Sequence, residues 1–139
     1  MAELAARWYA AWNAKALDKI LALYADDVEF ASPLVAQLRA GSDGVIRSKG
    51  ELTEYFRNAL ERSADMKFKP IAECKGVRGA TLIYVNHREQ LVAESHEVNE
   101  AGLIARADVS YAPLPKEFLP KVEAKLKSIT VGGAAVLAQ

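Results

Sequence analysis

Apolar side chains recur at helical spacing near the start of the chain. Leu4, Trp8 and Trp12 occupy successive i, i+4 positions, which predicts one face of an amphipathic helix that ends near Asn13. The same spacing over residues 17–24 predicts a second, shorter helix. The chain is therefore expected to begin with two helices.

The next segment changes to the alternation of a strand. Residues 28–30 alternate with a period of two, and Ser32-Pro33 ends the predicted strand because proline has no backbone N–H and restricts the residue before it. Residues 34–50 contain three glycines and hold no clear period, so we interpret them as a loop with room for one short strand. Long loops of this kind are often functional.

A third helix is predicted to begin near Ser48. Ser48 and Glu51 have the spacing of a capping box, in which each side chain can accept a hydrogen bond from the other's backbone N–H. The residues that follow supply an apolar stripe at helical spacing: Leu52, Tyr55, Phe56, Ala59 and Leu60.

The period changes again after this helix. Turn-forming residues separate four extended runs, which predicts an antiparallel meander over residues 66–75, 80–86, 89–99 and 103–111. Pro70 removes a backbone donor, so its strand is expected at an edge or with a bulge. Beyond Pro113, apolar residues return to helical spacing and predict a terminal helix: Phe118, Val122, Leu126 and Ile129. Helices followed by a sheet indicate the α+β class.

Composition narrows the possible partners. The 139 residues suit one domain, and Lys plus Arg equals Asp plus Glu at 18 each, so we expect no nucleic acid and no membrane as partner. The longest apolar run, residues 131–138, is far shorter than the roughly 20 residues of a membrane span. Cys74, the only cysteine, is expected to pack in the core as a free thiol, which favours a reducing, cytoplasmic location.

Three stretches carry a resemblance to a known family. They are Tyr24-Ala25-Asp26-Asp27-Val28-Glu29-Phe30-Ala31-Ser32-Pro33, residues 43–56 and residues 98–104. In order and spacing the chain resembles the nuclear-transport-factor-two-like superfamily, in its SnoaL-like branch, whose relatives include ketosteroid isomerases and polyketide cyclases. The resemblance implies a cystatin-like cone: three N-terminal helices packed on a strongly curved, mainly antiparallel sheet with one pocket. Residues 1–112 would form the cone, and residues 113–139 a C-terminal helical extension of the same domain.

The resemblance also implies which residues line the pocket. Counting along the chain places Glu94 where ketosteroid isomerases carry a protonated acid, Trp8 at their oxyanion tyrosine and Ser32 at their general-base aspartate. Serine lacks the basicity of a carboxylate, and an indole N–H donates a hydrogen bond but is no general acid, so isomerase chemistry of that design is not expected. The expected substrate-binding residues are Trp8, Trp12, Tyr24, Phe30, Ser32, Tyr55, Phe56, Val92, Val109 and Tyr111.

Glu94 and His96 form the candidate catalytic pair. They lie two residues apart, so the strand period places them on one face together with Val92 and Val98, but periodicity does not say which face is buried. A carboxyl group beside an imidazole in an apolar cavity could pass a proton near neutral pH. The alternative is that both are solvent-facing polar residues on a half-exposed strand.

The last strand offers a second arrangement of charges. Its small apolar row suits the cavity, which leaves Arg106 and Asp108 on the outer face or at a dimer interface. Epoxide hydrolases of this superfamily need an Asp-Arg-Asp cluster inside the pocket. Arg106 and Asp108 would contribute to one only if the two rows were inverted.

Other chemistries have little support. His87 and His96 lack the spacing of a metal site, and the sequence contains no nucleotide-binding glycine motif or G-x-S-x-G string, so no metal and no cofactor are expected. Three functions stay open. The first is an isomerase, cyclase or lyase acting on a small hydrophobic carbonyl compound, with Glu94 as acid/base. The second is a non-catalytic binder of a hydrophobic metabolite, and the third is a homodimeric protein-interaction module.

Overall fold

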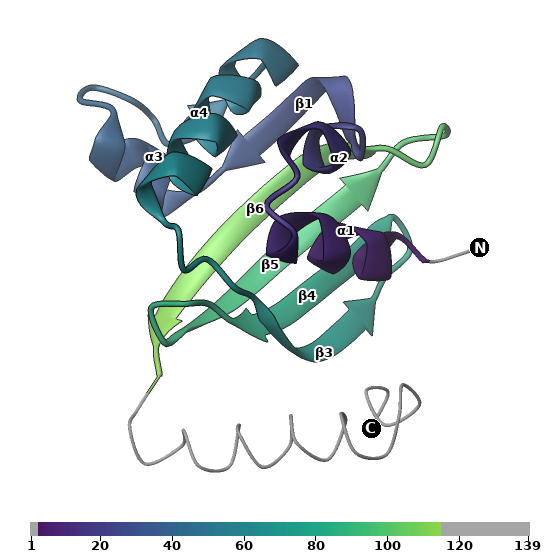
Figure 1. Ribbon diagram of the computed structural model, residues 1–139. Coiled ribbons are helices and arrows are strands. Elements are labelled where there is room, and N and C mark those ends of the chain that lie inside the picture. The colour runs from purple at the N-terminus through teal and green to yellow at the C-terminus, as the bar shows by residue number, and fades with distance from the viewer. Residues whose placement is uncertain (1–2, 115–139) are drawn as a thin grey trace.

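One curled, open, mixed sheet forms the frame of the protein (Figure 1). The computed structural model describes residues 3–114. Its six strands are arranged in the order β2-β1-β6-β5-β4-β3. Their bounds are Tyr24–Ala31 for β1, Val45–Ile46 for β2, Lys69–Lys75 for β3, Gly79–Val85 for β4, Gln90–Val98 for β5 and Ile104–Pro113 for β6. The α+β class is therefore confirmed.

The last four strands form the predicted antiparallel meander. Each pairs with its neighbour in sequence, whereas β1 returns to lie parallel to β6. β3 is an edge strand, and its register shifts between Pro70 and Ala72, so the proline occupies both of the environments that its missing N–H favours. Cys74 lies on this same edge strand and is exposed, so its expected core position was wrong.

The helices cover one face of this sheet (Figure 1). They are α1, Leu4–Asn13; α2, Leu17–Leu21; α3, Pro33–Leu38; and α4, Lys49–Arg62. The end of α1 at Asn13 is confirmed, and this residue joins the helix to the strand layer because its amide donates to the Phe68 carbonyl and accepts from the Phe68 N–H. The second predicted helix was too long at its end, since Tyr24 already belongs to β1.

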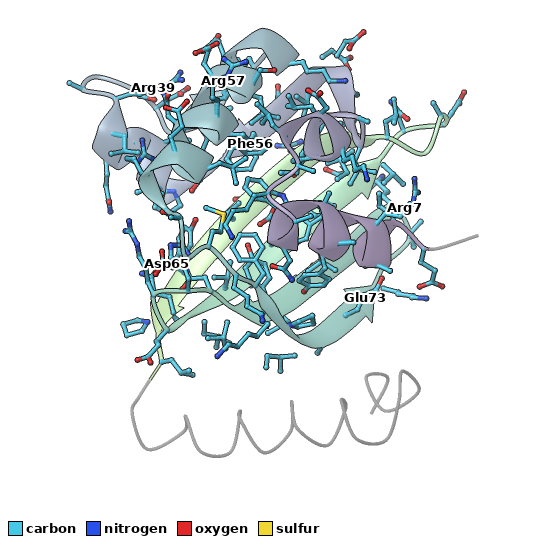
Figure 2. The ribbon with its side chains drawn as sticks, in the orientation of Figure 1. Arg7, Arg39, Phe56, Arg57, Asp65 and Glu73 are labelled. Atoms are coloured by element: carbon cyan, nitrogen blue, oxygen red, sulfur yellow. The ribbon has the colours of Figure 1, made fainter. Side chains whose placement is uncertain are left out.

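The helix predicted to begin near Ser48 is α4, and it begins where the capping signal placed it. Ser48 Oγ accepts from the backbone N–H of Glu51 at 3.2 Å, which satisfies one of the free donors of the first turn. Figure 2 shows Phe56 pointing from α4 toward the sheet, whereas Arg57 lies on the opposite side of the helix. α4 thus presents its apolar stripe to the interior.

Residues 34–50 are not only a loop. The short strand β2 is present, but α3 precedes it and makes a fourth helix among the described residues. Ser32 Oγ accepts from the Leu34 N–H at 3.2 Å, and Pro33 occupies the first helical turn, where a missing N–H costs nothing. The signal that ends β1 therefore also starts a helix.

Aromatic side chains fill the space between the helices and the sheet. Trp8 stacks on Phe68 with ring centroids 5.5 Å apart, and Phe68 in turn lies 4.6 Å from Tyr84. Trp12 meets Phe56 edge to face at 4.8 Å. This cluster links α1, α4 and the sheet into one core.

The remaining predictions concern the C-terminal segment and membrane-spanning helices. The predicted C-terminal helix and the helical extension fall on residues 115–139, which lie outside the described residues. None of the helices in residues 3–114 has the length and apolar character needed to cross a membrane.

Candidate functional site

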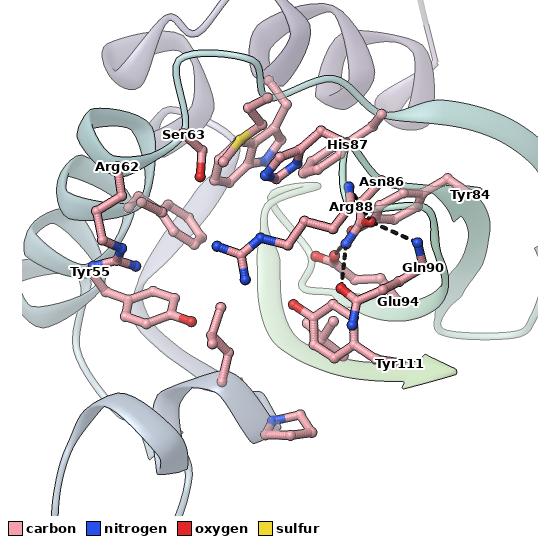
Figure 3. A pocket seen from close by; sticks show the side chains of 18 of the residues that line it. Tyr55, Arg62, Ser63, Tyr84, Asn86, His87, Arg88, Gln90, Glu94 and Tyr111 are labelled. Atoms are coloured by element: carbon pink, nitrogen blue, oxygen red, sulfur yellow. Dashed lines mark hydrogen bonds between the residues drawn. The ribbon is translucent and has the colours of Figure 1, made fainter. Parts of the chain in front are cut away.

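A cavity of about 360 Å³ opens between the concave face of the sheet, α1, α3, α4 and the β4–β5 turn (Figure 3). This volume is at the lower end of the usual range for small-molecule sites, which are mostly apolar with a few polar groups. Aromatic rings form much of its wall, and polar side chains gather near the β4–β5 turn and the end of α4. The lining residues are Trp8, Trp12, Phe30, Pro33, Leu34, Gln37, Tyr55, Phe56, Ala59, Arg62, Ser63, Met66, Phe68, Tyr84, Asn86, His87, Arg88, Gln90, Glu94, Val109 and Tyr111.

Glu94 is a buried carboxyl group in the cavity wall. The β5 alternation turns Val92, Glu94 and His96 inward, and Glu94 is only 4% exposed. Its Oε1 accepts from the Tyr84 hydroxyl at 2.8 Å, and its Oε2 lies 2.8 Å from His96 Nε2. Both carboxyl oxygens therefore have a partner, as a buried carboxylate requires.

Tyr84 is a partner that the sequence reasoning did not identify. It lies on β4 beside Val92, so its side chain shares the inner face with Glu94 on the next strand. Burial, followed by the charge of Glu94, raises the pKa of Tyr84 well above its usual value. The phenol therefore keeps its proton at neutral pH and donates a hydrogen bond to the carboxylate.

His96 faces a different space from Glu94. It is 5% exposed, and its ring lies 5.3 Å from that of Trp8. His96 does not line the main cavity but lines a second one of about 280 Å³, beside the start of α1 and the β3–β4 turn. The hydrogen-bonded pair therefore lies between the two cavities, with the carboxyl group on one side and the imidazole on the other.

Trp8 uses its polar atom inside the protein. Its Nε1 donates to the Tyr24 hydroxyl at 2.9 Å, and Tyr24 is fully buried. Burial, together with the charge of Glu94, raises the pKa of Tyr24 well above its usual value, so this phenol also stays neutral. The Trp8 ring lines the cavity, but its N–H is already engaged.

The other predicted lining residues separate into two groups. Trp12, Phe30, Tyr55, Phe56, Val109 and Tyr111 line the cavity. Tyr24, Ser32 and Val92 are buried but are not among the lining residues. Ser32 serves as the N-cap of α3, and its side chain also lowers in part the burial-raised pKa of Tyr55 and of Tyr111.

Polar side chains also line the cavity at its opening, which we call the mouth: the tyrosines Tyr55 and Tyr111 and the arginines Arg62 and Arg88. Burial raises the pKa of Tyr55 to about 12, and burial likewise raises the pKa of Tyr111, so both phenols remain neutral donors at pH 7. Arg62 at the end of α4 and Arg88 in the β4–β5 turn also line the cavity. Neither arginine was expected there from the sequence.

The outer face of the sheet carries the remaining predicted charges. Arg106 and Asp108 are exposed, and Arg106 Nε lies 3.8 Å from Glu97 Oε2 on the neighbouring strand. The two rows of β6 are therefore not inverted, and these residues contribute nothing to the cavity. Within residues 3–114 no three His, Cys, Asp or Glu side chains come together in a group that could hold a metal ion.

Comparison with known proteins agrees with the fold. The model of the SnoaL-like domain family matches residues 5–107. A SnoaL-like protein of unknown function from Burkholderia thailandensis E264 is 34% identical, with a TM-score of 0.74, and the match covers 78% of this chain and 91% of that one. Among curated proteins, none matches the sequence.

Two more distant structures share the fold. A protein of unknown function with a cystatin-like fold from Methylobium petroleophilum PM1 is 19% identical, covers 81% of this chain and 76% of its own, and has a TM-score of 0.62. The second is SalBIII, an epoxide hydrolase/cyclase-like enzyme with a role in pyran ring formation in the polyether salinomycin. It is 16% identical, the match covers 78% of this chain and 88% of that one, and the TM-score is 0.60. The chain belongs to the family of SnoaL-like domains and has their cystatin-like fold.

Proposed function

We propose that the cavity binds a small, largely apolar carbonyl compound and that Glu94 moves a proton on it, as an isomerase, cyclase or lyase would require. The observation that carries this proposal is the burial of Glu94 in the cavity wall, where the Tyr84 hydroxyl donates to one carboxyl oxygen and His96 Nε2 lies within hydrogen-bond distance of the other. A carboxylate held in one orientation inside an apolar cavity is suited to remove a proton from carbon and return it elsewhere.

His96 and the mouth tyrosines would support this transfer. The imidazole lies 2.8 Å from Glu94 Oε2 and can donate to the carboxylate or accept its proton, depending on the tautomer. Negative charge that develops on the carbonyl oxygen needs a hydrogen-bond donor, and Tyr55 and Tyr111, whose hydroxyls can donate, both line this cavity. Glu94 would be the acid/base, with His96 as its partner.

Deuterium incorporation tests the reaction without knowledge of the product. In D₂O, the wild-type protein should accelerate exchange at the carbon next to the carbonyl of a small apolar ketone, with 1-indanone and 4-phenyl-2-butanone as probes read by proton NMR. Glu94→Gln should keep ketone affinity and slow the exchange by at least about 100-fold, the usual contribution of acid–base catalysis. Glu97→Gln makes the same change on the outer side of β5 and should exchange like wild type.

A non-catalytic binder of the same kind of ligand is the second candidate. It is favoured by the internal pairing of the polar groups: Trp8 donates to Tyr24, and both Glu94 oxygens already have partners. Ketones that bind the wild type without any exchange above buffer would establish this candidate and contradict the enzymatic proposal.

A further inference from the structure

The charges around the cavity are unevenly distributed. Glu94 is the only acidic side chain among the lining residues. The basic ones are Arg62, Arg88 and His87, and burial lowers the pKa of the His87 imidazole. Neither arginine lies within ion-pairing distance of a carboxylate in residues 3–114. Of the other six arginines, four have such a partner: Arg39, Arg47, Arg57 and Arg106. Arg7 and Arg78 also lack one among the described residues, but neither lines this cavity. The cavity therefore presents two uncompensated guanidinium groups.

Arg88 extends into the opening from a firmly held turn. Figure 3 shows its side chain reaching from the β4–β5 turn across the cavity toward Tyr55 and Arg62. Asn86 fixes this turn, since its buried Oδ1 accepts from the backbone N–H groups of Arg88 and Gln90, each at 3.0 Å. The Asn86 amide also donates to Gln90 Oε1 at 3.0 Å. The guanidinium is thus carried by a backbone with little freedom.

The two arginines act on the same part of the wall. Burial raises the pKa of Tyr111, and the Ser32 hydroxyl and then Arg88 lower it in part. Burial also raises the pKa of Tyr55, and Arg62 is the first of the groups that lower it in part. Figure 3 shows Arg62 beside Tyr55 and the Arg88 side chain in the space between Tyr55 and Tyr111. The mouth is an electropositive region with two neutral hydroxyl donors beside it.

We propose that the ligand of this cavity is an apolar carboxylate, with its carboxylate group between Arg88 and Arg62 and its apolar body against the aromatic wall. This inference rests on the proposed function only in that both place the ligand in the same cavity. Guanidinium groups match a carboxylate in charge and planar geometry. The buried Glu94 repels a second carboxylate, so the charges orient the ligand with its acidic end outward and the rest of its body, including any carbonyl group on which Glu94 acts, toward Glu94.

A matched pair of probes tests this inference. 4-Phenylbutyrate and 4-phenylbutan-1-ol share one apolar body and differ in the charged group. The chain has two tryptophans, Trp8 and Trp12, and both line the cavity, so intrinsic fluorescence reports binding directly. At low ionic strength the carboxylate should bind about tenfold more tightly than the alcohol, and added salt should reduce that difference.

Variants identify the source of the preference. Arg88→Gln should weaken the carboxylate about tenfold and leave the alcohol within about twofold. Arg57→Gln is the matched control, because Arg57 lies on the outer side of α4 and pairs with Glu54, so it should change neither probe. Asn86→Ala keeps Arg88 but releases the turn, and it should weaken the carboxylate selectively in a protein shown to be folded by circular dichroism.

The outcomes separate this inference from the proposed function. Equal wild-type affinity for both probes, or a carboxylate affinity that Arg88→Gln leaves unchanged, overturns the carboxylate inference while the cavity remains a binding site. Failure of both probes to change the fluorescence contradicts binding in this cavity, and the proposed function fails with it.

Discussion

The hydroxyl of Tyr84 allows the buried Glu94 cluster to be tested by stability alone. Tyr84→Phe removes the oxygen that donates to Glu94 Oε1 at 2.8 Å. The ring contacts remain, because Phe68 and Trp8 lie 4.6 Å and 5.6 Å from the Tyr84 ring centroid and do not depend on the hydroxyl. The substitution therefore isolates one hydrogen bond at a site that is 3% exposed.

The expected cost follows from the charge of the acceptor. A hydrogen bond to a charged group contributes about 1.5–3 kcal/mol, and a buried carboxylate that loses a donor keeps its desolvation penalty. We expect Tyr84→Phe to lower the free energy of unfolding by about 2 kcal/mol at pH 7. With a urea dependence of about 2 kcal/mol per molar, the midpoint would fall by about 1 M.

Tyr9 provides the matched control within the same aromatic cluster. Its ring meets that of Tyr84 edge to face at 5.9 Å, but its buried hydroxyl has no hydrogen-bond partner in the described part of the chain. Removal of an unsatisfied polar group should be neutral or stabilising, so Tyr9→Phe should leave the urea midpoint unchanged or raise it. Equal losses in the two variants would refute the assigned role of the Tyr84 hydroxyl.

Three further predictions concern packing, pH and assembly. Gly79→Ala should cost about 3 kcal/mol or more in urea unfolding, because its Cβ would lie 1.8 Å from the His96 carbonyl oxygen, whereas Gly50→Ala has nothing within 4 Å and should stabilise α4. Burial raises the pKa of all five tyrosines, so with rising pH the unfolded chain loses these protons before the folded protein does. The tyrosine contribution to the free energy of unfolding should therefore be fully present below about pH 10. It should be lost as the pH rises through the tyrosine pKa values of the folded protein, about 12 for the pKa of Tyr55. Tyrosinate absorbance should then appear in one cooperative step with unfolding, and independent titration near pH 10 would contradict this. Light scattering after size exclusion should show a homodimer, and a monomer at every concentration would reject it.

The periodic parts of the fold could be predicted from the sequence, since they depend on neighbours three, four or two residues apart. Ser48 identified the start of α4, and Pro70 identified both an edge strand and an irregular register. α3 was missed because six residues are too few to establish a period, and Ser32-Pro33 fits both the end of a strand and the start of a helix. Cys74 was misplaced although Pro70 indicated an edge position for the same strand, because the sequence does not show that the last residues of β3 are left uncovered.

The site depends on contacts that a single sequence does not contain. Alternation placed Glu94 and His96 on one face, and the structure shows that this face is the inner one. The contribution of Tyr84 follows from the register between β4 and β5, which only the paired sheet defines. Arg62 and Arg88 lie at a helix end and in a turn, where long side chains can point in several directions. Their approach to one cavity follows from how the helices pack on the sheet.

The central claim is that Glu94 transfers a proton to and from a ligand in this cavity. The most direct test is the rate of deuterium incorporation into a bound ketone by Glu94→Gln and by Glu97→Gln, measured at saturating ketone. The account predicts that Glu97→Gln exchanges at the wild-type rate and that Glu94→Gln is slower by at least about 100-fold while ketone affinity is retained. Equal exchange rates in the two variants would contradict it.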